Sequence, residues 1–478
     1  MGQEIKLEHL LEIEKKYNLY QDKIENVPYW IYSRFDIWEN IIMKESMGLE
    51  AAHIGRTRMS DRIGIYMHLL FNSIFRKNIK KQPIVFLYNS SARTYKNGYY
   101  VSEYTDYIEK LFPDNLILES PYLLEHVQPI ENKNVFFLDY ILLQQEVYYR
   151  ICKTLLKKKY KSYEEQVTQR VEAPLTELEE LWGLKINRKK IKEEVVKHIL
   201  SYKVGIKLVE KLVNNLNPKL LIEIVSYSPI SMMFNEVCAR KEIPTIELQH
   251  GIMNKHISYS YYSRNRILQL PKKIFLFSDF WREQVVLPLK EEELPAVGFY
   301  SFDEGIRKSK KIDEFDDGKK NILFISQGPI GKKLCDLAIK LSEKIDANEY
   351  RILYKLHPGE VVKYDEYKVM EQYGIVVLHT KEYSLYDLFA SSEIQIGVYS
   401  TALYEGLGFG LDTYIYKIEQ SDYMSELCRL GYAHFIENEE ELEYLIKKNK
   451  EKNEGNKGFW KTTSLDDVKK LIENVFNN

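Results

Sequence analysis

Short runs of apolar residues recur along the chain from residue 83 onward, and between them lie stretches whose apolar positions are three or four residues apart. The runs predict buried strands and the stretches between them predict amphipathic helices. The predicted strands cover residues 83–88, 116–118, 135–142, 220–225, 244–248, 273–278, 296–298, 321–325, 350–356, 374–378, 394–398 and 413–416. This alternation is typical of an α/β fold with parallel sheets.

The predicted strands fall into two groups on either side of residues 303–320, which are strongly charged and have no apolar periodicity. We place a domain boundary there. The first domain is expected to span residues 1–305, with helical additions at 1–80 and 163–215. The second is expected to span 318–458, and a final helix within 459–478 to pack back toward the first domain.

The stretch IQIGVYSTALYEGLGFG (residues 394–410) predicts a strand that leads directly into a helix. Ser400 and Thr401 are placed to cap that helix, whose free N–H groups and positive dipole end suit a phosphate. Glu405 lies four residues after Thr401, so both project from one helix face, where a carboxylate could hold ribose hydroxyls. An ordinary strand-to-helix turn would show the same pattern.

The predicted strand 244–248 delivers Gln249, His250 and Gly251 to the carboxyl end of its sheet, where ligands bind in parallel α/β folds. Gly251 permits close approach of a ligand to the backbone. Because imidazole titrates near neutrality, His250 is a better candidate for a catalytic base than the other nine histidines. Glu247, on the same strand, is the second candidate.

The first predicted strand runs into a polar loop that contains Ser90 and Arg93. Such a loop lies at the ligand edge of a parallel sheet, so we expect both residues to bind substrate. Arg93 could receive a phosphate or a carboxylate, although a surface arginine on a loop is the commoner case.

Composition limits the class of protein. The chain has 478 residues and a formal net charge of −2, which gives no overall attraction to nucleic acid. The four cysteines are far apart and form no metal-binding pair, so buried free thiols are expected. The first residues lack an apolar signal region and no apolar run approaches the ~20 residues of a membrane span, so we expect a cytoplasmic protein.

Three short motifs resemble those of a known architecture. KLHPGE (residues 355–360) looks like the HP motif of bacterial sialyltransferases and related capsule enzymes, and YST (399–401) looks like their S-S/T motif. ELQHG (247–251) is similar to a motif of surface-polysaccharide synthesis proteins. Together with the layout of residues 83 to about 430, they resemble the GT-B glycosyltransferases. That resemblance implies two Rossmann-like domains that face a central cleft.

The resemblance also implies roles for individual residues. His357 would approach the leaving phosphate of a nucleotide-sugar donor, Ser400 and Thr401 would hold that phosphate, and Glu405 would bind the ribose. The remaining donor-side residues would be Gln327, Gly328, Pro358 and Gly359. Ser90, Arg93, Gln249 and Gly251 would face the acceptor. The acidic D/E-D/E-G motif that supplies the base in one sialyltransferase family has no clean equivalent here, so the base stays open between His250 and Glu247.

On this interpretation the protein is an inverting glycosyltransferase of capsule, lipopolysaccharide or glycoprotein-glycan synthesis. Without a convincing DxD loop, we expect neither a metal nor another cofactor. The motif pair favours a CMP-activated nonulosonic (sialic) acid or Kdo-type sugar, transferred to a glycan or lipid-linked glycan. The basic run at 153–161 would suit a peripheral membrane contact, although such runs are usually only solvated.

Three other functions are compatible with the sequence. Teichoic-acid polymerases transfer a polyol phosphate from a CDP-alcohol and have an HP-type histidine in a similar setting. UDP-sugar 2-epimerases share the architecture and need no acceptor. A non-catalytic protein of capsule assembly is the third possibility.

Overall fold

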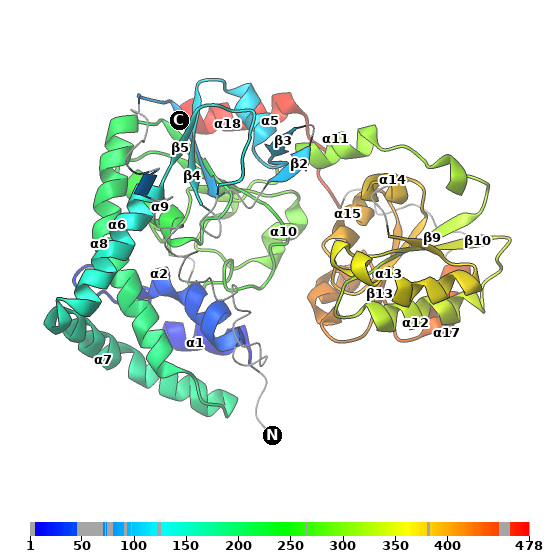
Figure 1. The fold of residues 1–478 in the computed structure, drawn as a ribbon, viewed down its shortest axis with the longest axis horizontal. Helices are drawn as coiled ribbons and strands as arrows, with labels where there is room; N and C mark the ends of the chain where they lie inside the picture. Colours follow the sequence, from blue (N-terminus) through cyan, green and yellow to red (C-terminus); the bar gives the residue numbers. More distant parts are fainter. Residues whose placement is uncertain are drawn as a thin grey trace. The chain divides into compact units, whose positions relative to one another are not determined.

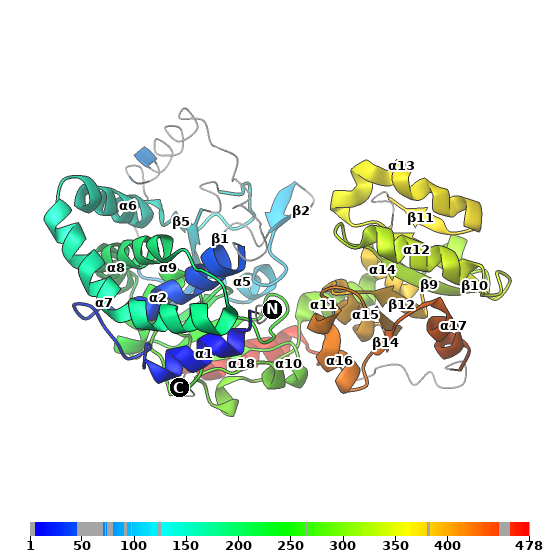
Figure 2. The same ribbon diagram turned by 90° about the horizontal axis from the view of Figure 1, so that it is seen from below.

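The computed structural model describes residues 5–44, 70, 71, 73, 80–89, 93–96, 98–121, 126–263, 265–379, 383–448 and 459–477 (Figures 1 and 2). The chain divides into two compact units. Unit 1 comprises Met1–Val297 and Leu465–Asn478, and unit 2 comprises Gly298–Ser464.

Unit 1 is built on a six-stranded sheet in which every neighbouring pair is parallel. Its strands, in the order β5-β4-β1-β6-β7-β8, put the first strand of the chain in the middle. This is the strand order of the dinucleotide-binding Rossmann fold, and its topological switch point lies between β1 and β6. The strands are β1 (Ile84–Asn89), β4 (Asn115–Ser120), β5 (Val135–Phe137), β6 (Leu220–Glu223), β7 (Thr245–Leu248) and β8 (Lys273–Phe275).

Helices cover both faces of this sheet. On one face α5 (Asp106–Leu111) and the C-terminal α18 (Leu465–Asn477) lie against each other, and Val468 and Ile472 of α18 join a core with Ile84 and Phe86 of β1. The other face carries α9 (Pro229–Arg240), because Asn235 on α9 donates to Glu223 on β6. Behind α9 lies α8 (Arg188–Leu216), which packs in turn on α6 (Asp139–Thr154) and α7 (Lys157–Trp182).

Smaller elements complete the unit. The N-terminal segment forms α1 (Leu7–Lys16), α2 (Tyr29–Phe35) and a π-helix, η1 (Asp36–Met43). The others are the antiparallel pair β2 (Thr94–Lys96) and β3 (Tyr99–Val101), α10 (Asp279–Gln284) and the 3-10 turn η3 (Glu291–Glu293). Two sequence predictions need correction. The strand expected at 135–142 stops at Phe137, because Asp139 starts α6, and 296–298 contributes only a bridge between Ala296 and Leu276.

Unit 2 repeats the same strand order, β11-β10-β9-β12-β13-β14, again with all pairs parallel. The prediction of an α/β protein with two Rossmann-like domains is therefore confirmed. The strands are β9 (Lys320–Ile325), β10 (Tyr350–Lys355), β11 (Val376–Leu378), β12 (Ile394–Gly397), β13 (Asp412–Tyr416) and β14 (His434–Ile436). The last of these was not predicted.

The helices of unit 2 alternate with its strands. They are α11 (Tyr300–Lys308), α12 (Gly331–Ser342), α13 (Tyr364–Tyr367), α14 (Leu385–Ala390), α15 (Ala402–Gly408), α16 (Ser425–Arg429) and α17 (Glu439–Lys448). The 3-10 turns are η4 (Asp313–Phe315), η5 (Pro358–Lys363), η6 (Lys368–Tyr373) and η7 (Ser421–Met424). The charged residues 303–320 are thus partly helical, since the buried side chains of Phe302, Ile312 and Phe315 anchor α11 and η4. In the part of the chain that the structure describes, no helix is both long and apolar enough to cross a membrane.

A buried ion pair ties the N-terminal helices to the body of unit 1. The Arg34 guanidinium contacts the Glu14 carboxylate through Nε (2.9 Å) and Nη2 (3.1 Å), and both side chains are at most 2% exposed. Trp30 and Tyr20 also donate to Glu14, so its charge is well solvated by protein groups. Arg34 further donates to the carbonyls of Ile257 and Ser260, which lie in the loop that follows β7.

We predict that Arg34→Met lowers the free energy of unfolding by about 3–5 kcal/mol, because it leaves the Glu14 carboxylate buried without its partner. Urea unfolding followed by tryptophan fluorescence would measure the loss. The double variant Arg34→Met/Glu14→Gln should recover part of it, since it removes the stranded charge. A cost below about 1 kcal/mol for the single variant would show that the pair does not hold this segment.

Candidate functional site

Three neighbouring strands of unit 2 end in polar residues at one edge of the sheet. The central strand β9 leads to Gln327, β10 on one side leads to His357, and β12 on the other leads to Ser400. The Gln327 side chain accepts a hydrogen bond from the backbone N–H of Tyr399 (3.4 Å), which links two of these strand ends. Neighbouring strands lie about 4.8 Å apart, so the three residues line one ligand-sized stretch of edge at the switch point of the fold.

His357 is held in a defined tautomer by its own turn. It is the N-cap of η5, and its Nδ1 accepts a hydrogen bond from the Gly359 N–H (3.1 Å). In the neutral ring the proton is then on Nε2, which leaves an N–H donor on an exposed side chain. Pro358 begins the turn, and Glu360 closes it by accepting from the His357 N–H (3.0 Å).

Buried polar groups support this turn from below. Glu360 is 2% exposed and also accepts from the Tyr367 hydroxyl (2.5 Å). Gly331, at the start of α12, lies so close to Glu360 and Tyr367 that a β-carbon there would overlap both. Sequence reasoning missed the role of Glu360, although an acid three residues after an N-cap is the signal of a capping box.

The turn before α15 differs from the prediction. Ser400 accepts a hydrogen bond from the Ala402 N–H (3.3 Å), but Thr401, the exposed N-cap residue, makes no capping bond with its side chain. The helix has only seven residues, which gives a weaker dipole than expected. Glu405 lies half-buried on it, and Gly406 is required because a side chain there would overlap Gln395 of β12.

A longer helix starts at the same edge. α12 has twelve residues and follows Gln327 and Gly328, which has open space where a side chain would be. Its first turn carries the exposed cations Lys332 and Lys333, and Lys333 pairs with Glu419. The helix N-terminus best suited to a phosphate is therefore that of α12, after the central strand, rather than that of α15.

In unit 1, His250 lies at the end of β7 between two aromatic side chains. Its ring centroid is 6.4 Å from that of Tyr104 and 6.3 Å from that of Tyr227. Burial lowers the pKa of His250 to about 4, and the Leu248 carbonyl offsets only part of that effect. Nδ1 is buried and makes no hydrogen bond of normal geometry with the described residues. The imidazole is therefore neutral at physiological pH, beside the open space at Gly251.

Glu247 lies fully buried beneath this edge. Its Oε1 accepts from the Ser226 N–H (3.4 Å) and the Tyr259 hydroxyl (3.3 Å), and burial raises its pKa to about 7. Glu223 is its register partner on β6, and burial together with the Glu247 charge raises the Glu223 pKa well above its usual value. Because Glu247 is inside the sheet packing, it cannot reach a substrate without movement of the strand end.

Two residues expected to contact a substrate have structural roles instead. Gln249 is 1% exposed and clamps neighbouring strand ends, accepting from the Phe277 N–H and donating to the Gly251 carbonyl (both 2.8 Å). Arg93 has a side chain 1% exposed and pairs with Glu119 (2.5 Å), so it is not available to an external anion. Ser90 lies outside the described residues.

The partner of Arg93 belongs to a buried chain of charges. His126 contacts Glu119 through Nδ1 (2.6 Å) and Asp139 through Nε2 (2.9 Å). Burial opposes protonation of His126, but the hydrogen bonds to the two carboxylates outweigh it and raise its pKa to about 9. The network therefore alternates positive and negative charges, which compensate one another.

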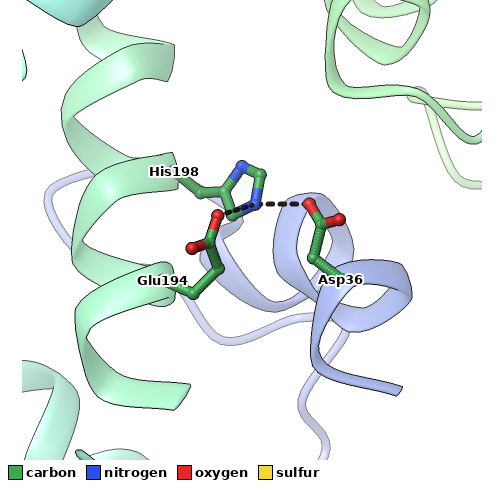
Figure 3. A group of neighbouring side chains, drawn as sticks. All are labelled: Asp36, Glu194 and His198. Atoms are coloured by element: carbon green, nitrogen blue, oxygen red, sulfur yellow. Dashed lines mark hydrogen bonds and ion pairs between the residues drawn. The ribbon is translucent and has the colours of Figure 1, made fainter. Parts of the chain in front are cut away.

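Among the described residues, Asp36, Glu194 and His198 form the group that could hold a metal ion (Figure 3). Both carboxylates point at Nε2 of His198, at 2.9 Å from Asp36 and 3.4 Å from Glu194. Lys197, however, donates to the same oxygen of Glu194 (3.0 Å). The Lys197 ammonium group thus already occupies one side of the three-residue group. We interpret this group as a polar cluster that joins η1 to α8.

No protein-family model and no curated protein matches the sequence. Among solved structures, the UDP-GlcNAc 2-epimerase from Methanocaldococcus jannaschii is similar with a TM-score of 0.47 and 11% identity, over 83% of this chain and 99% of that one. For S. aureus MnaA with UDP the values are 0.44 and 10%, over 83% and 96%. For the wall teichoic acid polymerase TagF they are 0.44 and 11%, over 86% and 93%. Identities this low assign no role to any residue of this chain.

Proposed function

We propose that the protein is an inverting, metal-independent glycosyltransferase whose unit 2 binds a nucleotide-activated sugar. The observation that carries the proposal is the convergence of Gln327, His357 and Ser400 on three adjacent strand ends of a Rossmann-like sheet. An amide, an imidazole N–H and a hydroxyl are groups that bind phosphate and ribose oxygens. The N-terminus of α12 and its lysines add positive charge without a metal ion.

His357 stabilises the leaving nucleotide in this proposal. Its Nε2–H would donate to a phosphate oxygen as negative charge develops there, while Nδ1 stays engaged with the Gly359 N–H. A donor fixed before the reaction needs no reorganisation when the charge appears, which is the basis of such stabilisation. The exposure of the ring at the sheet edge is compatible with direct contact.

His250 is our choice for the base that accepts the proton of the attacking hydroxyl. It is neutral at physiological pH and lies at the strand edge, whereas Glu247 is fully buried. A pKa of about 4 describes the ring without substrate. Glu247 then acts as a buried support of the β6–β7 strand ends.

The donor is proposed to be a CMP-activated nonulosonic acid or Kdo-type sugar, and the acceptor a glycan. This choice is supported by the likeness of the HPGE and YST segments to the HP and S-S/T motifs, with His357 and Ser400 on the two sides of β9. Reaction with a CDP-alcohol, 2-epimerisation of a UDP-sugar and a purely structural role are the competing outcomes of the experiments below.

Thermal shift with CMP, CDP, UDP and GDP should show the largest stabilisation by CMP, about 2.7 kcal/mol at a hundred times its Kd. His357→Asn keeps a side chain that can cap the turn but lacks the imidazole, and should weaken CMP binding roughly tenfold to a hundredfold. His434→Asn, on the edge strand β14, is the matched control and should bind normally. Preference for UDP or GDP would overturn the donor assignment, and CDP preference with a phosphodiester product would indicate polyol-phosphate transfer.

The pH profile of kcat/KM distinguishes the two candidate bases, with CMP release from CMP-N-acetylneuraminate and lactose as the assay. If His250 is the base, activity is retained down to about pH 5 and falls as pH drops through about 4, where the ring becomes protonated. A limb near pH 7 would instead indicate Glu247. His250→Asn should reduce kcat by about 10²–10⁴, whereas Glu247→Gln should keep most of it. Full activity of His250→Asn would contradict the assignment.

A further inference from the structure

The corner at which α6 runs into α7 concentrates positive charge. Residues 147–161 (VYYRICKTLLKKKYK) contain six cations and no acidic residue, in a protein with a net charge of −2. The cations are Arg150, Lys153, Lys157, Lys158, Lys159 and Lys161. This corner lies at the left edge of unit 1 in both views (Figures 1 and 2).

The same corner exposes a stripe of apolar side chains. Val147 and Ile151 are four residues apart and share one face of α6, Leu155 is the C-cap residue of that helix, and Leu156 is the N-cap residue of α7. Their exposed fractions are 46%, 38%, 77% and 45%. Singly exposed apolar residues are normal, but a continuous stripe with a polar rim marks an interaction surface.

Most of the charge in this corner is not neutralised locally. Lys157, Lys158 and Lys161 are exposed and make no ion pair with the described residues. Arg150 pairs with Glu146, while Lys153 and Lys159 donate to the hydroxyls of Tyr149 and Tyr148. The charges of Glu193 and Glu164 also act on Lys153 and contribute to a raised pKa of its ammonium group. The net field of the corner is therefore positive.

We propose that this corner, residues 147–161, docks on the surface of an anionic lipid bilayer. The apolar stripe would enter the headgroup region while the lysines remain at the level of the lipid phosphates. A nucleic acid offers the same negative charge but has no apolar layer for Leu155 and Leu156. A second copy of the chain, docked through the same corner, would bring six cations against six. Docking of this corner on a bilayer does not depend on the proposed reaction.

Flotation of the full chain with lipid vesicles tests the proposal. The protein should float with equimolar phosphatidylcholine and phosphatidylglycerol, should not float with phosphatidylcholine alone, and should release progressively as salt is added. Lys157→Glu/Lys158→Glu should weaken binding at least about tenfold. Leu155→Ser/Leu156→Ser removes the apolar contact and should lower the salt concentration at which half of the protein is released from the vesicles. Circular dichroism would verify that the surface variants are folded.

The matched control is Lys447→Glu/Lys448→Glu, which makes the same change in net charge at the end of α17 and should bind vesicles like the unaltered protein. If the control variant lost as much vesicle binding as Lys157→Glu/Lys158→Glu, the loss would be explained by net charge alone, and the assignment of this corner would be overturned. Failure of the unaltered protein to float with anionic vesicles at low salt would also overturn it. So would binding of a single-stranded RNA that the corner variants alone abolish, without vesicle binding.

Discussion

The buried pair between Arg34 and Glu14 is the interaction on which the candidate edge of unit 1 depends. A guanidinium in the protein interior must be compensated, and Glu14 together with the carbonyls of Ile257 and Ser260 does so. Those carbonyls belong to the loop that follows His250 and Gly251. The N-terminal helices therefore fix the course of the loop that follows the candidate base. If the loop moved, the buried Arg34 guanidinium would lose its hydrogen bonds to the two carbonyls.

In unit 2, buried neutral and acidic groups also hold the candidate edge of the sheet through hydrogen bonds. Glu360 accepts from the backbone of His357 and from Tyr367, and Gly331 leaves room for that contact at the start of α12. Gln395 donates to the Leu403 carbonyl and to Thr413, which seats α15 on its sheet. In both units, hydrogen-bonded polar groups under the sheet edge support the residues at that edge. This arrangement gives rigidity at the positions where chemistry needs fixed geometry.

Burial also sets the protonation states of the candidate groups. His250 is neutral because burial lowers its pKa, whereas His126 is charged because hydrogen bonds to two carboxylates outweigh its own desolvation and raise its pKa. Glu247 and Glu223 lie side by side on β7 and β6, so ionisation of one opposes ionisation of the other. Two residues of the same type thus differ in charge because different groups surround them in space. The residues next to them in the sequence do not reveal this difference.

The sequence by itself determined the alternation of strands and helices, because that depends on local hydrophobic period. It also determined that Gln327, His357 and Ser400 follow strands, so a parallel sheet had to bring them to a common edge. It did not show that Glu119 captures Arg93, that Gln249 clamps β7 to β8, or that Arg34 finds Glu14 and a loop more than 200 residues away. Those pairings were decided only by the tertiary structure, since the energy of a buried charge depends on which groups surround it in space, and these come from distant parts of the chain.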